Sequence, residues 1–163
     1  MRMETDDDLR FDHGEATPER LKGQFSRLVG KTAAQTRRVA GDALRAVGAR
    51  KDDFVVLAVL AESGPASQAV LAGRTQIYKS DLVAVLNELA ERGWVLRAPD
   101  PEDRRRNVVT LTDDGRRRLA ELDGVLDGVN EHIMSPLDAA ERTQLFALLG
   151  RVNAHLAGAA EES

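Results

Sequence analysis

The feature that most constrains the fold is a helical apolar pattern interrupted once, by two short segments of β-forming residues. Apolar residues recur every three or four positions through most of the 163-residue chain, and only 4% of its residues are aromatic. The exceptions are residues 94–98 and 108–112, which flank a loop rich in proline and charge at 99–106. We therefore predict a mainly α protein that carries one β-hairpin.

The composition excludes several classes of protein. The chain has no cysteine, which excludes disulfides, thiolate metal sites and cysteine nucleophiles. Its longest apolar run, Phe54 to Ala61, is far shorter than the ~20 residues that a membrane-spanning helix needs. The N-terminus is acidic and lacks the apolar stretch of a secretory signal. We therefore expect a cytoplasmic protein without a membrane partner.

The charged residues are distributed unevenly along the chain. The net charge is −4, yet residues 1–15 and 119–163 together carry −10, while residues 16–118 carry +6. A basic centre in an acidic chain is compatible with a local surface that binds an anion such as nucleic acid. The alternative is a set of charges that only solvate the surface.

The order of the predicted elements indicates the architecture. We expect one long amphipathic helix over residues 17–48, capped by Thr17 with Pro18 at its first position, and further helices at about 52–63, 67–73 and 79–92. The hairpin follows, and then two helices capped by Thr112 and Asp138. This order predicts a winged helix-turn-helix with a two- or three-stranded β wing, flanked by N- and C-terminal helices.

The terminal helices are predicted to serve a different purpose from the centre. We divide the chain into a mobile acidic arm (1–16), an N-terminal dimerisation helix (17–48), a winged helix-turn-helix DNA-binding region (49–112) and C-terminal dimerisation helices (113–163). Dimerisation is inferred because two apolar seams have little else in the sequence to cover them. These seams are Leu119, Leu122, Leu126, Val129 and Ile133, followed by Leu145, Leu149, Val152 and Leu156.

A helix-turn-helix needs a small residue where its two helices touch and apolar residues that hold the second helix on the first. Ala72 supplies the small residue, and the apolar residues are Leu71, Ile77, Leu82 and Val85. Gln76 occupies the turn position where glycine is often found. This pattern alone has low specificity, because many helical hairpins contain it.

The start of the helix at 79–92 supplies candidate contacts to DNA bases. Its first turn would enter the major groove, where Lys79 and Ser80 could each reach guanine or phosphate and Asp81 a cytosine amino group. Ala84 could touch only a thymine methyl, and Gln76 lies just before this helix. The competing interpretation is a solvated helix start, in which Asp81 only complements the helix dipole.

The hairpin loop carries a more specific signal. Arg104, Arg105 and Arg106 form a positive tip suited to the minor groove, and Asp103 is expected to pair with Arg105 across the turn. Val109 and Leu111 alternate and should anchor the strand in the core.

The segment from Asp103 to Gly115 follows the pattern D-x-R-x-x-x-V-x-L-T-x-x-G, which resembles the wing signature of the MarR family of transcription regulators. The segment Leu89 to Val95 resembles that family's junction between helix and wing, and the helix order matches over about residues 18–157. Family members often have arginine where Ala84 stands, so base readout there is expected to differ.

The resemblance implies a homodimer on double-stranded DNA, formed by the first and the last two helices. It also implies a wing in which Arg105 enters the minor groove with support from Asp103. Lys79, Ser80 and Asp81 would lie in the major groove. A small anionic or phenolic ligand would regulate binding from a site near Phe54 and Trp94, although the sequence does not define its residues.

The search for catalytic and metal sites gives negative expectations. Gly30, Lys31 and Thr32 resemble the end of a phosphate-binding loop, but Phe25 replaces its first glycine and the segment is predicted to be helical. His13, His132 and His155 are far apart in the sequence. We therefore expect no enzyme, cofactor or metal. The alternative function is a helical dimeric adaptor that binds protein rather than DNA.

Overall fold

The computed structural model describes residues 17–161, and the predicted acidic arm at 1–16 lies outside them. The chain divides into two compact units, Met1–Leu126 and Asp127–Ser163.

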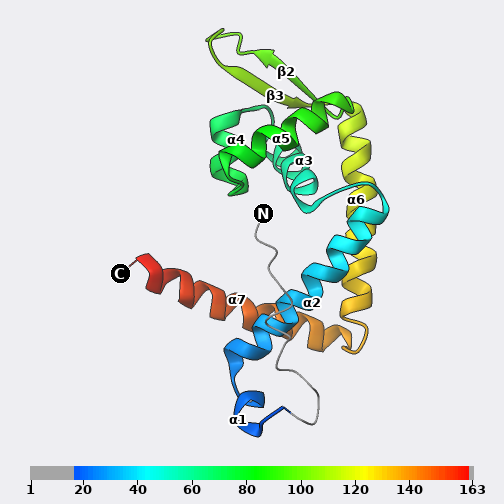
Figure 1. Cartoon of the computed structure of the whole chain (residues 1–163), viewed down its shortest axis with the longest axis vertical. Helices are drawn as coiled ribbons and strands as arrows, with labels where there is room; N and C mark the ends of the chain where they lie inside the picture. The colour runs from blue at the N-terminus through cyan, green and yellow to red at the C-terminus, as the bar shows by residue number, and fades with distance from the viewer. Residues whose placement is uncertain (1–16, 162–163) are drawn as a thin grey trace. The chain divides into compact units, whose positions relative to one another are not determined.

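Helices dominate both units, and the predicted fold class is confirmed (Figure 1). The elements are α1 (Glu19–Lys22), α2 (Phe25–Ala46), α3 (Lys51–Ser63), β1 (Ala66–Ser67), α4 (Gln68–Thr75), α5 (Lys79–Glu91), β2 (Val95–Pro99), β3 (Asn107–Leu111), α6 (Asp113–Ile133) and α7 (Ala139–Glu161). The three strands form an antiparallel sheet in the order β1-β3-β2. The two-residue strand β1, which precedes α4, was not located by the sequence pattern.

The prediction of a single helix over residues 17–48 was wrong. The helix α1 ends at Lys22; its C-cap residue Gly23 keeps right-handed angles (φ −81°, ψ −1°), and the chain leaves the helical conformation at Gln24, which is extended (φ −84°, ψ 112°). Glycine favours such a break because it costs more conformational entropy in a helix than other residues do. The helix also begins one residue later than predicted, because Pro18 is the N-cap residue of α1 and not its first helical residue.

The first unit has a closed hydrophobic core between α3, α4, α5 and the sheet. Leu57, Leu71, Leu82 and Leu86 are fully buried, and Val109 of the central strand seals the core from the sheet side. Ala72 and Ile77 pack against this core as the helix-turn-helix pattern predicted. Figure 1 shows the β2–β3 hairpin extending from this group of three helices.

The start of α6 belongs to the same core, contrary to the prediction that its apolar seam lacks cover within the chain. Leu122 is fully buried, and Leu119 and Leu126 pack against the core cluster. The sequence pattern could not separate an apolar face covered by the chain itself from one that needs another chain.

The start of α6 is also fixed against the hairpin. The Thr112 hydroxyl accepts a hydrogen bond from the Gly115 amide (3.0 Å), as the predicted cap requires, and donates one to the Gly93 carbonyl (2.7 Å). A Cβ atom at Gly115 would overlap the Trp94 carbonyl oxygen and lie 2.6 Å from Leu111 Cδ1. Gly115 therefore permits the close approach of α6 to the backbone that enters β2.

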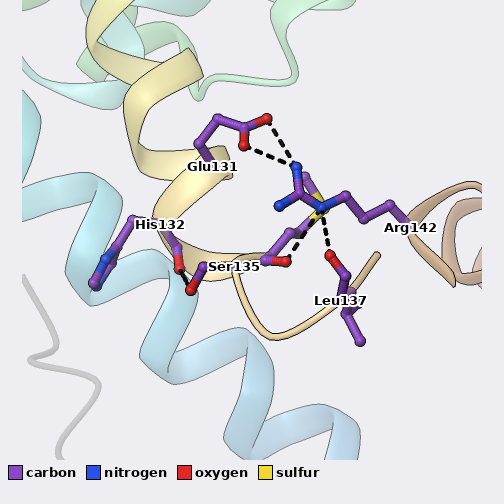
Figure 2. A network of polar contacts seen from close by, with 6 residues as sticks. Glu131, His132, Ser135, Leu137 and Arg142 are labelled. Atoms are coloured by element: carbon purple, nitrogen blue, oxygen red, sulfur yellow. Dashed lines mark hydrogen bonds and ion pairs between the residues drawn. The ribbon is translucent and has the colours of Figure 1, made fainter. Parts of the chain in front are cut away.

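The second unit is a helical corner stabilised by one arginine. Figure 2 shows Arg142 at its centre, where Nε donates to the Leu137 and Met134 carbonyls (3.1 and 3.2 Å) and Nη1 pairs with both Glu131 oxygens (2.9 and 2.8 Å). The predicted cap of α7 is confirmed as a reciprocal pair: the Glu141 amide donates to Asp138 Oδ1, and the Asp138 amide donates to Glu141 Oε2.

Candidate nucleic-acid interface

The turn between α4 and α5 sets the direction of the helix that follows. Gln76 adopts the left-handed conformation (φ 56°), which costs an L-residue about 1–2 kcal/mol. The Thr75 hydroxyl donates to the Leu71 carbonyl (2.7 Å) and accepts from the Ile77 amide (3.3 Å), which stabilises the turn on both sides. Gln76 thus acts as the turn residue of a helix-turn-helix, although glycine would adopt this conformation with less strain.

One face of α5 is buried and the other is open to solvent. The buried face consists of Leu82, Val85, Leu86 and Leu89. The predicted contacts Lys79, Ser80, Asp81 and Ala84 are all exposed, and they share the open face with Asn87. The Ser80 hydroxyl lies 3.4 Å from Asp81 Oδ1, so these two side chains form a weak polar pair. This helix can therefore present polar groups to a groove without disturbing the core.

The wing, which comprises β2, β3 and the loop 100–106, has an ordered tip. The Asp100 amide donates to the Arg106 carbonyl (2.7 Å), and the Arg106 amide donates to the Asp103 carbonyl (2.9 Å). The Asp100 carboxylate accepts from the Glu102 amide (2.9 Å), and the Asp103 carboxylate accepts from the Arg105 amide (3.1 Å). Aspartates commonly form such turns by accepting from the amide two residues ahead.

The three arginines of the tip are not equivalent. Asp103 contacts Arg105 only through the backbone amide, and its ion pair is with Arg106 (3.6 Å). The predicted pairing of the Asp103 and Arg105 side chains was therefore wrong, because the turn brings the third arginine back toward the carboxylate. Arg104 and Arg105 are exposed and have no ion pair with a described residue, so they are the available cations of the tip.

A side-chain link between α5 and the wing escaped the sequence analysis. Arg97 Nη1 in β2 donates to Asn87 Oδ1 on the open face of α5 (2.8 Å). Two spacings in the sequence could have indicated it. Arg97 follows the buried Val95 by two residues and so shares its side of the strand, and Asn87 lies seven residues after Ser80 on one helix face. The link joins the two elements that the sequence singled out.

Trp94 lies between two cations near the predicted ligand region. The guanidinium carbons of Arg92 and Arg118 each lie 5.0 Å from its ring centre, within the range of a cation–π interaction. The same arginines donate to the Gly48 carbonyl (3.2 Å) and the Val47 carbonyl (2.5 Å) at the end of α2. Both cations are therefore engaged in structural contacts, and they connect α2 to the winged region.

The remaining candidates lie on ordinary surfaces. Gly30, Lys31 and Thr32 lie within α2, as the helical pattern predicted. His132 and His155 lie on α6 and α7, and His13 falls outside the described residues. Within the described range 17–161, no three histidine or acidic side chains are grouped so that they could hold a metal ion. None of the described helices is both long and apolar enough to cross a membrane.

Comparison with known proteins finds a family of transcription regulators. A sequence model of the MarR family matches residues 42–106. The transcriptional repressor NicR of Pseudomonas putida is 33% identical over 99 residues, which are 61% of this chain and 63% of NicR. The transcriptional regulator HosA of Escherichia coli is 32% identical over 101 residues, which are 62% of this chain and 74% of HosA.

A solved structure extends the match to most of the chain. Bordetella bronchiseptica BpsR, whose DNA binding is regulated by 6-hydroxynicotinic acid, superposes with a TM-score of 0.70 and 25% identity. The alignment covers 83% of this chain and 97% of that one. The sequence match covers slightly less than two thirds of NicR, whereas the structural match includes almost the whole BpsR chain.

Proposed function

The chain belongs to the MarR family, and from this premise we propose that it is a sequence-specific regulator of transcription that binds double-stranded DNA as a repressor. The observation that carries this proposal is that one compact unit contains both the open face of α5 and the wing with its exposed Arg104 and Arg105, and that the Arg97–Asn87 hydrogen bond links these two elements. Lys79, Ser80 and Asp81, with Gln76 and Ala84 beside them, would face the major groove. Arg105 would enter the minor groove, flanked by Arg104 and Arg106 and shaped by Asp103.

We propose that the regulator is a homodimer on an imperfect inverted repeat. The apolar side chains exposed on α7 and at the start of α2 support this, because large exposed apolar patches mark interaction sites. These side chains are Phe25, Leu28, Leu145, Phe146, Leu148, Leu149 and Leu156. The proposed dimerisation segments, 17–48 and 113–163, contain all of them, and the DNA-binding region at 49–112 lies between these segments.

A small aromatic acid is the effector that we propose. The regulation of BpsR by 6-hydroxynicotinic acid supports this chemistry, as does the expectation of an anionic or phenolic ligand from the family resemblance. An effector of this kind should lower DNA affinity, and nicotinic acid, which lacks the hydroxyl, provides a matched comparison.

We also propose that the chain has no catalytic activity and works in the cytoplasm. A regulator acts by occupying DNA, so no reaction is required of it, and it must share a compartment with the DNA it binds. These statements follow from the proposed function.

Fluorescence anisotropy tests the proposal on DNA from upstream of the protein's own gene, over a salt series with random competitor DNA. We expect tight binding that resists the competitor. The logarithm of the binding constant should fall linearly with the logarithm of the salt concentration, with a slope of about −0.9 for each phosphate contact. Binding equal to that of the competitor would contradict the proposal. A protein-binding adaptor that uses its leucine seams would instead show little salt dependence.

A further inference from the structure

The Arg97–Asn87 hydrogen bond lies where the two proposed DNA-reading elements meet. Val95 and Arg97 share one side of β2, and their partners in β3 are Leu111 and Val109. Val95, Val109 and Leu111 are all buried, so this side of the strand faces the helices. Arg97 is nevertheless exposed, because it lies beyond the edge of the core, where its Nη1 reaches Asn87 (2.8 Å).

The partner of Arg97 is neutral, which distinguishes this arginine from several others in the protein. Arg50 pairs with Glu88 (2.5 Å), Arg106 with Asp103 (3.6 Å), and Arg142 with Glu131 (2.8 Å). Across residues 17–161, Arg97 has no carboxylate within ion-pair distance. An amide oxygen can orient a guanidinium group without neutralising its charge, and most of the five N–H donors stay available.

The position and the charge together indicate an anionic partner. A sugar-phosphate strand separates the major groove from the adjacent minor groove, so a protein that fills both grooves crosses that strand. In a complex with α5 in the major groove and the wing in the minor groove, Arg97, which joins the two elements, would lie at this crossing. Arginine is suited to the site because its planar group can hold a phosphate through two parallel hydrogen bonds.

We propose that Arg97 binds a backbone phosphate between the two grooves and that Asn87 positions it for this contact. The inference rests on the proposed function and deepens it, because it identifies a contact that fixes the register of the protein on DNA without reading sequence. Asn87 acts through Arg97 and is a positioning residue.

Arg97→Gln and Asn87→Asp test the two roles by different routes. Arg97→Gln removes the cation, so we expect it to bind at least tenfold more weakly to a DNA site that the wild-type protein recognises. The salt slope should fall by about 0.9 for each protomer bound. Asn87→Asp strengthens the link to Arg97 but neutralises its charge, so we expect a similar fall in slope. Arg97→Lys keeps the charge and should retain the wild-type slope.

The double variant with both Arg97→Gln and Asn87→Asp separates charge neutralisation from simple repulsion by a new carboxylate. If the phosphate contact exists, Asn87→Asp should change the slope much less in the Arg97→Gln background than in the wild type. Arg117→Gln serves as the matched control, because Arg117 is an exposed arginine of α6 that is already paired with Asp114. Thermal unfolding verifies that each variant is folded.

An unchanged salt slope in Arg97→Gln or Asn87→Asp would overturn this inference and assign the link a purely structural role in bracing the wing. Equal effects of Asn87→Asp in both backgrounds would overturn the positioning role of Asn87. If the wild-type protein binds no DNA sequence better than the random competitor, the proposed function is wrong, and so is this inference, which rests on it.

Discussion

The two units of this protein differ in how they use their apolar residues. In the unit that ends at Leu126, three helices and a sheet enclose leucines that are fully buried, such as Leu57 and Leu82. In the unit that begins at Asp127, α7 leaves Leu149 39% exposed and Phe146 66% exposed. Apart from the start of α2, where Phe25 and Leu28 are exposed, the winged region of the first unit encloses its own core, whereas α7 of the second unit leaves most of its large apolar side chains exposed.

This difference indicates that the two units have different functions. The first unit contains the open face of α5 and the wing, whose polar groups are exposed because the apolar residues beneath them form a closed core. The second unit is held at its corner by polar contacts around Arg142, and it keeps its apolar surface for the proposed partner chain. Substitutions on the DNA-reading surface are therefore expected to leave dimerisation unchanged.

The largest effect is expected from a substitution in the exposed apolar seam of α7. Leu149→Asp places a charge in the seam of α7, and in a symmetric dimer it does so twice, so association should weaken at least a hundredfold, or about 3 kcal/mol. Sedimentation velocity over a concentration series measures this loss. DNA binding should fall with it, because the two half-sites would no longer be bound together.

Ala154→Asp is the matched control for this experiment. Ala154 is exposed on α7, five residues from Leu149, and therefore lies away from the seam on the helix. It should leave the dimer intact. A dimer that survives Leu149→Asp, or one that Ala154→Asp disrupts equally, would contradict the placement of the interface.

The next effect tests the closed unit. Gly115→Ala should lower the free energy of unfolding by about 2–3 kcal/mol, because its Cβ would overlap the Trp94 carbonyl oxygen. Gly124→Ala on the same helix meets no atom within 4 Å and should raise the free energy of unfolding by about 0.5–1 kcal/mol. Urea denaturation of both variants measures the contrast, and two changes of the same sign would refute the close packing of α6 on the hairpin.

A smaller effect separates DNA reading from dimerisation. Arg105→Ala removes an unpaired cation of the wing and should weaken DNA binding about tenfold, or ~1.4 kcal/mol, while leaving the dimer unchanged. Arg106→Ala should cost less, because Asp103 already holds that side chain. Anisotropy titrations on one DNA site compare the two variants, and a larger loss for Arg106→Ala would reverse the assignment.

The smallest effect concerns the turn before α5. Gln76→Gly should stabilise the first unit by about 0.5–1 kcal/mol, since glycine adopts the left-handed conformation without a steric penalty, although it gains entropy on unfolding. Gln76→Ala keeps the penalty and should give no such gain. Thermal unfolding of the two variants checks the difference, and a destabilised glycine variant would show that the Gln76 side chain itself supports the turn.

Local patterns predicted most of the fold because they reflect local physics. Thr112 and Asp138 were expected as caps, and each accepts a backbone hydrogen bond in the structure. Turn chemistry and period-two alternation likewise located the hairpin and its buried anchors. The break at Gly23 was missed because the apolar spacing continues across it, and a single glycine does not always end a helix.

The candidate site was predicted less completely. The arginine cluster and the exposed start of α5 were evident from residue type, but the partners of these residues were not. The pairing of Asp103 with Arg106 depends on the exact course of a loop, and the Arg97–Asn87 link depends on the packing of α5 against β2. Contacts between elements are decided by tertiary geometry, which a periodic pattern does not contain.

Selection of binding sites from a pool of random double-stranded DNA tests the central claim most directly, because it examines DNA reading and dimer symmetry in one result. We expect an enriched imperfect inverted repeat whose half-sites are about 10 base pairs apart, one turn of the DNA helix. A pool without an enriched sequence, or with a single unrepeated half-site, would contradict a dimeric regulator that places one α5 in each of two major grooves.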